Sequence, residues 1–249
     1  MDNQVFKKTI GLTEKEFSYC PGCTHGVIHR LVAESLEELG VIGKAVGVAS
    51  VGCSVINYEF FDCDMQQAAH GRAPAVATGI KRVNPDNIVF TYQGDGDLAA
   101  IGTAEAIHAA HRSENITVIF VNNAIFGMTG GQMAPTTLKG QKTTTSQAGR
   151  DPHLAGMPIR MSEILGQVPG AHYVERVSVH DPKHIIKAKR AIKKAFKNQV
   201  DGKGFSLVEI ISTCPVNWKM TPVDSINWLK SNMIEYYPLG VIKDGDSND

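Results

Sequence analysis

The sequence lacks long apolar segments and an excess of either charge. Its 249 residues contain no uncharged apolar run of the roughly 18 residues that a membrane-spanning helix needs. Lys and Arg together number 25, as do Asp and Glu, so the chain lacks the basic character of a nucleic-acid-binding protein. The N-terminal residues also lack the apolar centre of a signal peptide. We therefore expect a cytoplasmic protein whose partners include neither nucleic acid nor membrane.

Cysteine is scarce and odd in number, with five in the chain. In a cytoplasmic protein, free thiols or metal ligands are the expected state of cysteine, rather than disulfides. Hydrophobic residues make up 43% of the chain and charged residues 20%, which is sufficient for a packed core. This composition excludes disorder over the whole chain.

Short apolar runs alternate with helical patterns along most of the sequence. The alternation is typical of an α/β protein with a mostly parallel, doubly wound sheet and helices on both faces. We expect one domain over residues 1–214 and a C-terminal tail, residues 215–249, that packs on this domain or on a partner subunit. We predict strands at 45–51, 88–92, 116–121, 173–179 and 205–211, and helices at 24–39, 68–81, 101–111 and 182–197.

Two further segments have no strong periodicity. Residues 127–160 are rich in Gly, Thr, Lys and Gln, and a loop of this length in a compact domain is usually functional or mobile. The acidic end of the chain, residues 243–249, is predicted to be frayed.

Polar residues follow two of the predicted strands. Gly94-Asp95-Gly96-Asp97 comes after the strand at 88–92, and Asn122-Asn123 closes the strand at 116–121, 28 positions beyond Asp95. Carboxyl ends of parallel strands meet at one edge of a sheet, where ligands bind. Carboxylate and amide oxygens there suit Mg²⁺, and glycines allow a pyrophosphate to approach the backbone. Alone, Gly-Asp-Gly would be an ordinary turn, so the paired asparagines carry the argument.

Four of the cysteines are predicted to reach the same edge. Cys20 and Cys23 form a CxxC turn, and Cys53 and Cys214 each follow a predicted strand. Four thiolates meeting there would hold Zn²⁺ or an iron–sulfur cluster. Alternatively, the CxxC is a redox pair and the other two are buried as small apolar residues. Cys63 is predicted to be a buried free thiol.

The Gly-Asp-Gly and Asn-Asn pair resembles the thiamine diphosphate (ThDP) motif. Over nearly its whole length, the chain resembles the β subunit of 2-oxoacid:ferredoxin oxidoreductases. The resemblance rests on the segments YCPGCTH, VGCS, AHGRAPAVATGIK, YQGDGDLAAIG, VNNAIFGMTGGQMAPTT and STCP. It implies the ThDP-binding fold and a 4Fe-4S cluster held by Cys20, Cys23, Cys53 and Cys214.

The resemblance also implies the cofactor contacts. Mg²⁺ would be held by Asp95, the Asn123 side chain and the Ile125 carbonyl. As a lone histidine, His70 is more often structural, but the family pattern favours a cofactor contact, and it is the one candidate for a catalytic role. Asp97 is predicted to be an acceptor behind the site or a helix N-cap, and the two roles are compatible. The residues expected to line ThDP are Val51, Gly52, Cys53, Ser54, His70, Gly94, Gly96, Asp97, Gly127 and Met128.

The implied activity is the CoA-dependent oxidative decarboxylation of a 2-oxoacid to acyl-CoA and CO₂, with electrons passing through the cluster to ferredoxin. An α subunit would supply the pyrimidine side of the ThDP site, alongside γ and ferredoxin-like δ subunits. Gly130 stands where many 2-oxoglutarate-type members carry a lysine. An unpaired buried carboxylate is costly, so we favour branched-chain substrates such as 2-oxoisovalerate, and 2-oxoglutarate next.

Two other functions share part of this sequence pattern. A non-redox ThDP-dependent decarboxylase or lyase β chain would need the Asp95 motif but not four convergent thiols. A non-catalytic scaffold stabilised by a cysteine-bound metal would need the thiols but not the pairing of Asp95 with Asn123.

Overall fold

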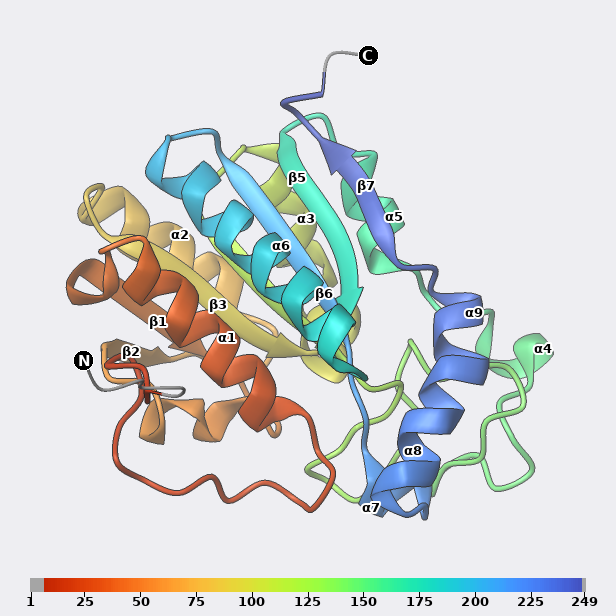
Figure 1. Cartoon of the computed structure of the whole chain (residues 1–249). Helices are drawn as coiled ribbons and strands as arrows, with labels where there is room; N and C mark the ends of the chain where they lie inside the picture. The colour runs from red at the N-terminus through yellow and green to blue at the C-terminus, as the bar shows by residue number, and fades with distance from the viewer. Residues whose placement is uncertain (1–6, 248–249) are drawn as a thin grey trace.

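A seven-stranded sheet forms the centre of the molecule (Figure 1). The structure is a computed structural model that describes residues 7–247. Neighbouring strands follow the order β2-β1-β3-β4-β6-β5-β7, and every pair is parallel except β5 with β7. The strands are β1 (Ala45–Ala49), β2 (Asp64–Gln67), β3 (Ile88–Gly94), β4 (Thr117–Asn122), β5 (Ala171–Ser178), β6 (Phe205–Ile211) and β7 (Gly240–Asp244). The predicted mostly parallel α/β fold is confirmed.

Helices cover both faces of this sheet (Figure 1). On one face, α1 (His25–Glu38) and α6 (Pro182–Val200) pack side by side on the central strands. On the other face lie α2 (Ala73–Val83), α3 (Thr103–His111) and α5 (Met161–Gly166). Because both faces are covered, β4 and β6 are buried along their whole length, as expected for parallel strands.

Short helical segments fill the connections between these elements. Two 3₁₀ turns, Ile42–Lys44 and Val55–Glu59, flank β1, and a π-helical turn, Asp97–Ile101, precedes α3. Glu114, just after α3, accepts hydrogen bonds from Arg82 of α2 (2.5 Å) and from Arg112 (2.8 Å), which links the helices of that face. Among residues 7–247, no helix has the length and apolar character needed to cross a membrane.

The strand registers bring the polar motifs to one level. Gly94 at the end of β3 lies opposite Val121 of β4, and Asn122 lies opposite Ile211 of β6. Asp95, Asn123 and the segment leading to Cys214 therefore leave the sheet at the same edge. This is the carboxyl edge, where ligands bind in open α/β sheets.

The sheet also contains two strands that the sequence did not predict. The short strand β2 pairs with β1, and the predicted helix at 68–81 begins later, at Ala73. The prediction of a frayed end is wrong for 243–247, because β7 pairs with β5 and Asp246 forms an ion pair with Lys203 (2.8 Å). Residues 248–249 of that prediction lie outside the described residues, as do residues 1–6 of the N-terminal segment for which no signal peptide is expected.

The long segment 127–160 is folded around one arginine. Arg150 is 5% exposed, and its guanidinium donates six hydrogen bonds of 2.8–3.2 Å to backbone carbonyls. The acceptors are Ala134, Pro135, Thr137, Ala155, Gly156 and Met157. The short helix α4 (Pro152–Ala155) lies within this segment. Internal hydrogen bonding, rather than a regular helix or strand, therefore defines its shape.

The C-terminal residues return to the carboxyl edge. They form α7 (Pro215–Trp218), α8 (Pro222–Trp228), the π-helical turn Leu229–Met233 and α9 (Ile234–Tyr236) before β7. Trp218, Met233 and Tyr237 bury themselves against Ala124 and Ile125, in a small core separate from the two sheet faces. The division of the chain after residue 214 stays a prediction.

Candidate functional site

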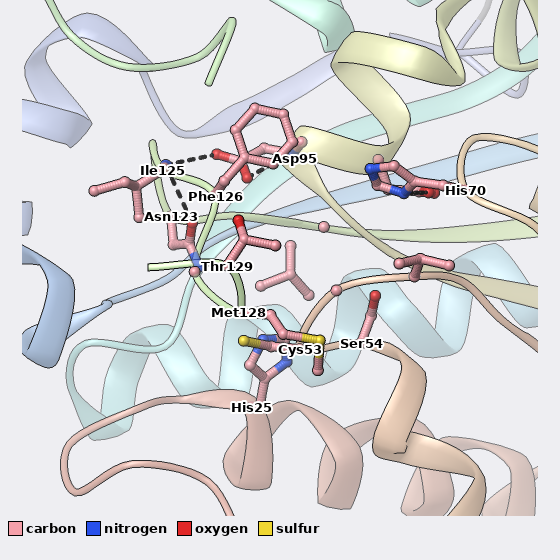
Figure 2. A pocket seen from close by; sticks show the side chains of 17 residues that line it. His25, Cys53, Ser54, His70, Asp95, Asn123, Ile125, Phe126, Met128 and Thr129 are labelled. Atoms are coloured by element: carbon pink, nitrogen blue, oxygen red, sulfur yellow. Dashed lines mark hydrogen bonds and ion pairs between the residues drawn. The ribbon is translucent and has the colours of Figure 1, made fainter. Parts of the chain in front are cut away.

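A cavity opens at the carboxyl edge, where β1, β3 and β4 end (Figure 2). The space between its lining atoms is about 520 Å³, which includes volume open to solvent. Every residue that the sequence predicted for ThDP or Mg²⁺ lies around it: Val51, Gly52, Cys53, Ser54, His70, Gly94, Asp95, Gly96, Asp97, Asn123, Ile125, Gly127 and Met128. The geometry therefore brings the predicted cofactor residues together; their roles in binding stay predictions.

Asp95 is a buried carboxylate held by neutral donors. Its Oδ1 accepts from the Gly96 N–H (2.8 Å), and its Oδ2 accepts from the Thr136 hydroxyl (2.5 Å) and the Ile125 N–H (3.2 Å). Burial raises the pKa of Asp95 to about 6, although these hydrogen bonds oppose the rise. No ion pair found within residues 7–247 includes Asp95. A buried carboxylate without a cationic partner fits a site that binds a metal ion.

Asn123 and Ile125 face Asp95 from the loop after β4 (Figure 2). The Asn123 Oδ1 accepts from the Ile125 N–H at 3.3 Å, so this side-chain oxygen lies beside the Asp95 carboxylate. Ala124, between them, has a φ of +58°. A backbone conformation that is unfavourable for a residue with a side chain thus turns the loop toward Asp95.

Glycines leave room for the backbone to approach a ligand. A Cβ on Gly94 would meet no atom within 4 Å, so this position borders open space. A Cβ on Gly96 would instead overlap the Phe126 ring. The open side of Gly94, next to Asp95, fits the diphosphate of a cofactor bound through Mg²⁺.

His70 and Asp97 form a pair on the other side of the cavity. The His70 Nδ1 lies 2.6 Å from the Asp97 Oδ1, which also accepts from the Gly71 N–H at 2.6 Å. Gln93 donates to the second carboxylate oxygen at 2.5 Å. Asp97 therefore acts as an acceptor behind His70, and the N-cap position of the following turn belongs to Gly96.

Other lining residues have different environments. The Ser54 hydroxyl donates to the Ser50 carbonyl at 2.9 Å, so it holds the turn after β1. The Val51 and Met128 side chains are 41% and 48% exposed. They present apolar surface to the cavity mouth.

Four thiols gather next to this cavity. The pKa of Cys23 rises to about 12 because of burial and because Cys214, Cys53 and Cys20 lie near it. Burial, Cys214 and Cys20 likewise raise the pKa of Cys53 to about 11. A Cβ on Gly127 would lie 3.3 Å from the Cys53 Sγ and 3.6 Å from the Cys214 Sγ. Since the Cys23 and Cys53 thiolates are disfavoured by burial and by their neighbours, a bound iron–sulfur cluster that stabilises thiolates would fit the group. No three of the four sulfurs, all of them within the described residues, lie within 4.8 Å of one another, so they are too far apart to share a single metal ion.

Cys63 lies apart from the four thiols. It is partly buried beside β2, and its sulfur is 3.8 Å from the Met65 sulfur. Burial raises its pKa to about 12. This position agrees with the predicted free thiol.

Sequence reasoning missed several residues at this site. His25, Val121, Phe126 and Thr129 also line the cavity. His25 is 2% exposed, and its Nδ1 lies 2.8 Å from the Tyr92 hydroxyl; burial lowers its pKa to about 4, so it is neutral at pH 7. Thr136, which donates to Asp95, was also missed. Phe126, Thr129 and Thr136 all stand within the segment VNNAIFGMTGGQMAPTT, which was a usable signal.

Comparisons with known proteins identify the family of the chain. The family model for thiamine pyrophosphate enzymes, C-terminal TPP binding domain, matches residues 50–210. The 2-oxoglutarate synthase subunit KorB of Archaeoglobus fulgidus is 36% identical over 214 residues, which are 86% of this chain and 76% of that protein. The chain belongs to the 2-oxoacid:ferredoxin oxidoreductase subunits.

Other members of this family match almost the whole chain. The ketoisovalerate oxidoreductase subunit VorA of Methanothermobacter thermautotrophicus is 48% identical over 242 residues, 97% of this chain. The chain spans about half the length of this relative, 51%. A solved 2-oxoglutarate:ferredoxin oxidoreductase from Magnetococcus marinus, with 2-oxoglutarate, coenzyme A and succinyl-CoA bound, superposes with a TM-score of 0.80 and 25% identity. That match covers 98% of this chain and 87% of the other.

Proposed function

We propose that this chain is the ThDP-binding β subunit of a CoA-dependent 2-oxoacid:ferredoxin oxidoreductase. The observation that carries the proposal is the position of Cys53. Cys53 lines the cavity that contains Asp95 and Asn123, and it is also a neighbour of Cys20 and Cys214. A group held by the four thiols would therefore border a cofactor held by the Asp95 loop.

The residues of the chain have distinct tasks in this proposal. Asp95, the Asn123 side chain and the Ile125 carbonyl would hold Mg²⁺, and the open side of Gly94 would take the diphosphate. Cys20, Cys23, Cys53 and Cys214 would hold a 4Fe-4S cluster. When bound, ThDP supplies the nucleophilic carbon and electron sink for decarboxylation, and the cluster supplies a one-electron acceptor. Two electrons leave per substrate, and they reduce ferredoxin while CoA takes the acyl group as a thioester.

His70 and the cavity mouth contribute in other ways. The contact with Asp97 fixes the orientation of the His70 ring at the cavity, which supports a contact between His70 and the cofactor. Val51 and Met128 would cover a bound cofactor at the cavity mouth and so limit its contact with water.

The assembly would include an α subunit that completes the ThDP site from the pyrimidine side, together with γ and ferredoxin-like δ subunits. We place the complex in the cytoplasm. The isolated chain should bind Mg-ThDP weakly and show no turnover, and substantial decarboxylation by the chain alone would contradict this.

For the substrate, we propose a branched-chain 2-oxoacid such as 2-oxoisovalerate. Gly130 lies in the loop after the cavity, with no atom within 4 Å of the position of a Cβ, so it offers no charge to a second carboxylate. The higher identity to a ketoisovalerate oxidoreductase subunit than to a 2-oxoglutarate synthase subunit agrees with this choice. A substrate panel on the assembled complex tests it, and a preference for 2-oxoglutarate would overturn it.

The hypothesis that the four cysteines hold a 4Fe-4S cluster is tested by metal analysis of the complex purified without oxygen. We expect Cys53→Ala and Cys214→Ala each to lose about four iron and four sulfide per chain relative to the wild type, and Cys63→Ala to lose none. The difference from the wild type is the quantity to read, because partner subunits can carry clusters of their own. Zinc in place of iron, or no metal that depends on these cysteines, would assign the chain to the non-redox ThDP lyases.

A further inference from the structure

The loop that faces Asp95 is held in an unfavourable backbone conformation. Ala124 has a φ of +58° and is fully buried, between the two residues proposed to bind Mg²⁺ through Asn123 Oδ1 and the Ile125 carbonyl. Such a conformation persists only where the surroundings enforce it, and it concentrates at functional sites. The residues that hold Ala124 in this conformation therefore help to shape the proposed metal site.

Two hydrogen bonds fix Ala124. Its N–H donates to the Asn122 Oδ1 at 3.1 Å, and its carbonyl accepts from the Thr137 hydroxyl at 2.7 Å. The Asn122 amide in turn donates to the buried Glu209 carboxylate at 2.7 Å. The loop is thus held from β6 on one side and from the segment at 134–138 on the other.

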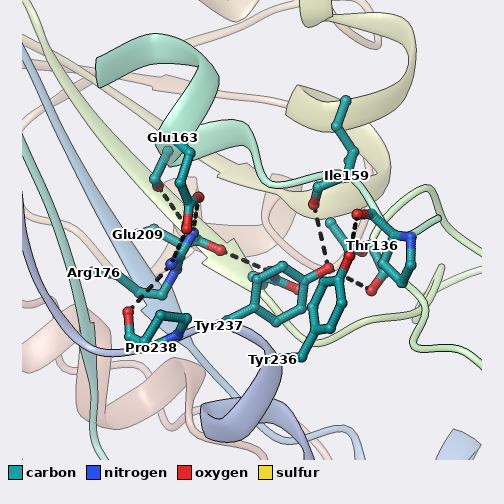
Figure 3. Close-up of polar contacts among 11 residues, drawn as sticks. Thr136, Ile159, Glu163, Arg176, Glu209, Tyr236, Tyr237 and Pro238 are labelled. Atoms are coloured by element: carbon teal, nitrogen blue, oxygen red, sulfur yellow. Dashed lines mark hydrogen bonds and ion pairs between the residues drawn. The ribbon is translucent and has the colours of Figure 1, made fainter. Parts of the chain in front are cut away.

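The Glu209 carboxylate belongs to a buried ion network (Figure 3). Arg176 donates through Nε to Glu209 at 2.7 Å and through its terminal nitrogens to Glu163. Its guanidinium also lies over the Tyr237 ring, 5.3 Å from the centroid, and donates to the Pro238 carbonyl at 3.2 Å. The network therefore connects the sheet with the C-terminal segment.

Tyr237 reaches Asp95 through a single residue. Its hydroxyl donates to the Thr136 carbonyl at 2.7 Å (Figure 3), and the Thr136 hydroxyl donates to the Asp95 Oδ2 at 2.5 Å. Tyr237 and Thr136 are both fully buried. Thr136 and the Ile125 N–H together occupy Oδ2, and the Gly96 N–H occupies one lone pair of Oδ1, so the remaining lone pair of Oδ1 is the one available to a cation.

We infer that Thr136 and Tyr237 are positioning residues of the metal site: Thr136 orients the Asp95 carboxylate, and Tyr237 fixes Thr136. The inference rests on the proposed function, because it assigns these residues to Mg²⁺ and ThDP binding. The alternative is that the two hydroxyls only satisfy buried polar groups. Variants that remove a single oxygen, or retain it, separate the two explanations.

The experiment uses the assembled complex stripped of Mg²⁺ and ThDP. Calorimetric titration gives the Mg²⁺ concentration that half-saturates ThDP binding, and the melting temperature of the stripped complex reports packing alone. We expect Thr136→Val to raise the half-saturating Mg²⁺ concentration roughly tenfold or more, as removal of outer-shell partners does in other metal sites. We expect Thr136→Ser, which keeps the hydroxyl, to remain within about twofold of the wild type. Tyr237→Phe should give a smaller rise of roughly threefold, because Thr136 keeps its own hydrogen bond to Asp95.

The outcomes are distinct. If Thr136→Val and Tyr237→Phe bind Mg²⁺ like the wild type, or if Thr136→Ser loses as much affinity as Thr136→Val, the positioning role is wrong while the proposed function stands. If ThDP binding by the wild-type complex does not depend on Mg²⁺, both the positioning role and the proposed function are wrong. The inference is supported if the half-saturating Mg²⁺ concentration rises in variants that lack a hydroxyl but not in Thr136→Ser, and if the melting temperature of the stripped complex does not fall to match.

Discussion

Replacing Arg150 by methionine should open the segment 127–160 without unfolding the sheet. The guanidinium is the common donor for six carbonyls of this segment, and methionine has a similar length but no donor. Each hydrogen bond from a charged donor is worth roughly 1.5–3 kcal/mol when its acceptor stays buried. On opening, however, the freed carbonyls are hydrated, so we expect a net loss of about 3 kcal/mol, the equivalent of one or two such bonds.

Hydrogen exchange of backbone amides measures this loss directly. When exchange follows local opening, about 3 kcal/mol corresponds to exchange that is faster by roughly two orders of magnitude. The amides to follow are those hydrogen-bonded within the segment, such as Gly140 N–H to the Arg150 carbonyl and Ile159 N–H to the Pro135 carbonyl. Amides of β4 and β6 should keep their protection, because their hydrogen bonds lie in the sheet.

The matched control is Arg190→Met, which removes an exposed arginine from α6. It should leave exchange in the segment unchanged. Arg150→Lys should recover only part of the protection, since an ammonium offers three donors in place of five. Acceleration of less than about fivefold at Gly140 and Ile159, or an equal acceleration in β4 and β6, would refute the reasoning that Arg150 organises this segment.

Two further predictions concern acid stability and the glycines of the site. Burial raises the pKa of Glu114, but its two arginine partners outweigh this effect and hold the pKa below the usual value. The ion pairs therefore stabilise the folded state fully above the unfolded-state pKa of about 4.3. This stabilisation is lost as the pH falls through the lower folded-state pKa. Glu114→Gln should therefore lower the free energy of unfolding in urea by about 1 kcal/mol at pH 7 and by progressively less below about pH 4.3; a difference that does not change with pH would contradict this. Gly96→Ala should lower the melting temperature of the stripped complex by roughly 3–10 °C, because the new Cβ would overlap Phe126. Gly94→Ala should leave the melting temperature unchanged, because its Cβ enters only open space, but it should weaken ThDP binding. Equal effects of the two substitutions on both measurements would show that neither space is used as described.

The sequence predicted the elements that are buried on both faces. The strand at 205–211 was predicted at its observed bounds, because five of the seven residues of Phe205–Ile211 are apolar and all seven are buried. By contrast, β2 has the sequence DMQQ and is mostly exposed at a sheet edge, so it shows neither apolar run nor alternation. β7 is likewise short, with two residues exposed and three partly buried, and only its pairing with β5 defines it as a strand. Elements defined by their partners, rather than by their own burial, give no local signal.

The same distinction applies to the site. Asp95, Asn123 and the cysteines were predicted because their residue types and spacing are characteristic of cofactor binding. Thr136 and Tyr237 were not, because the contacts that give them a role join residues 41 and 101 positions apart. A threonine or tyrosine is chemically unremarkable until the folded chain shows what its hydroxyl contacts.

The contact between Tyr237 and Thr136 has a consequence for the order of events during synthesis. Asp95 and Asn123 leave the ribosome long before residue 237, yet the hydrogen bond that fixes Thr136 beside Asp95 needs that residue. Contacts so distant in sequence form late, because the intervening chain must first be brought together. A nascent or truncated chain that ends before residue 237 can thus form much of the sheet while its metal site is still incomplete. In such a chain the proposed metal ligands would be present, but the Asp95 carboxylate would lack the support that reaches it from Tyr237 through Thr136.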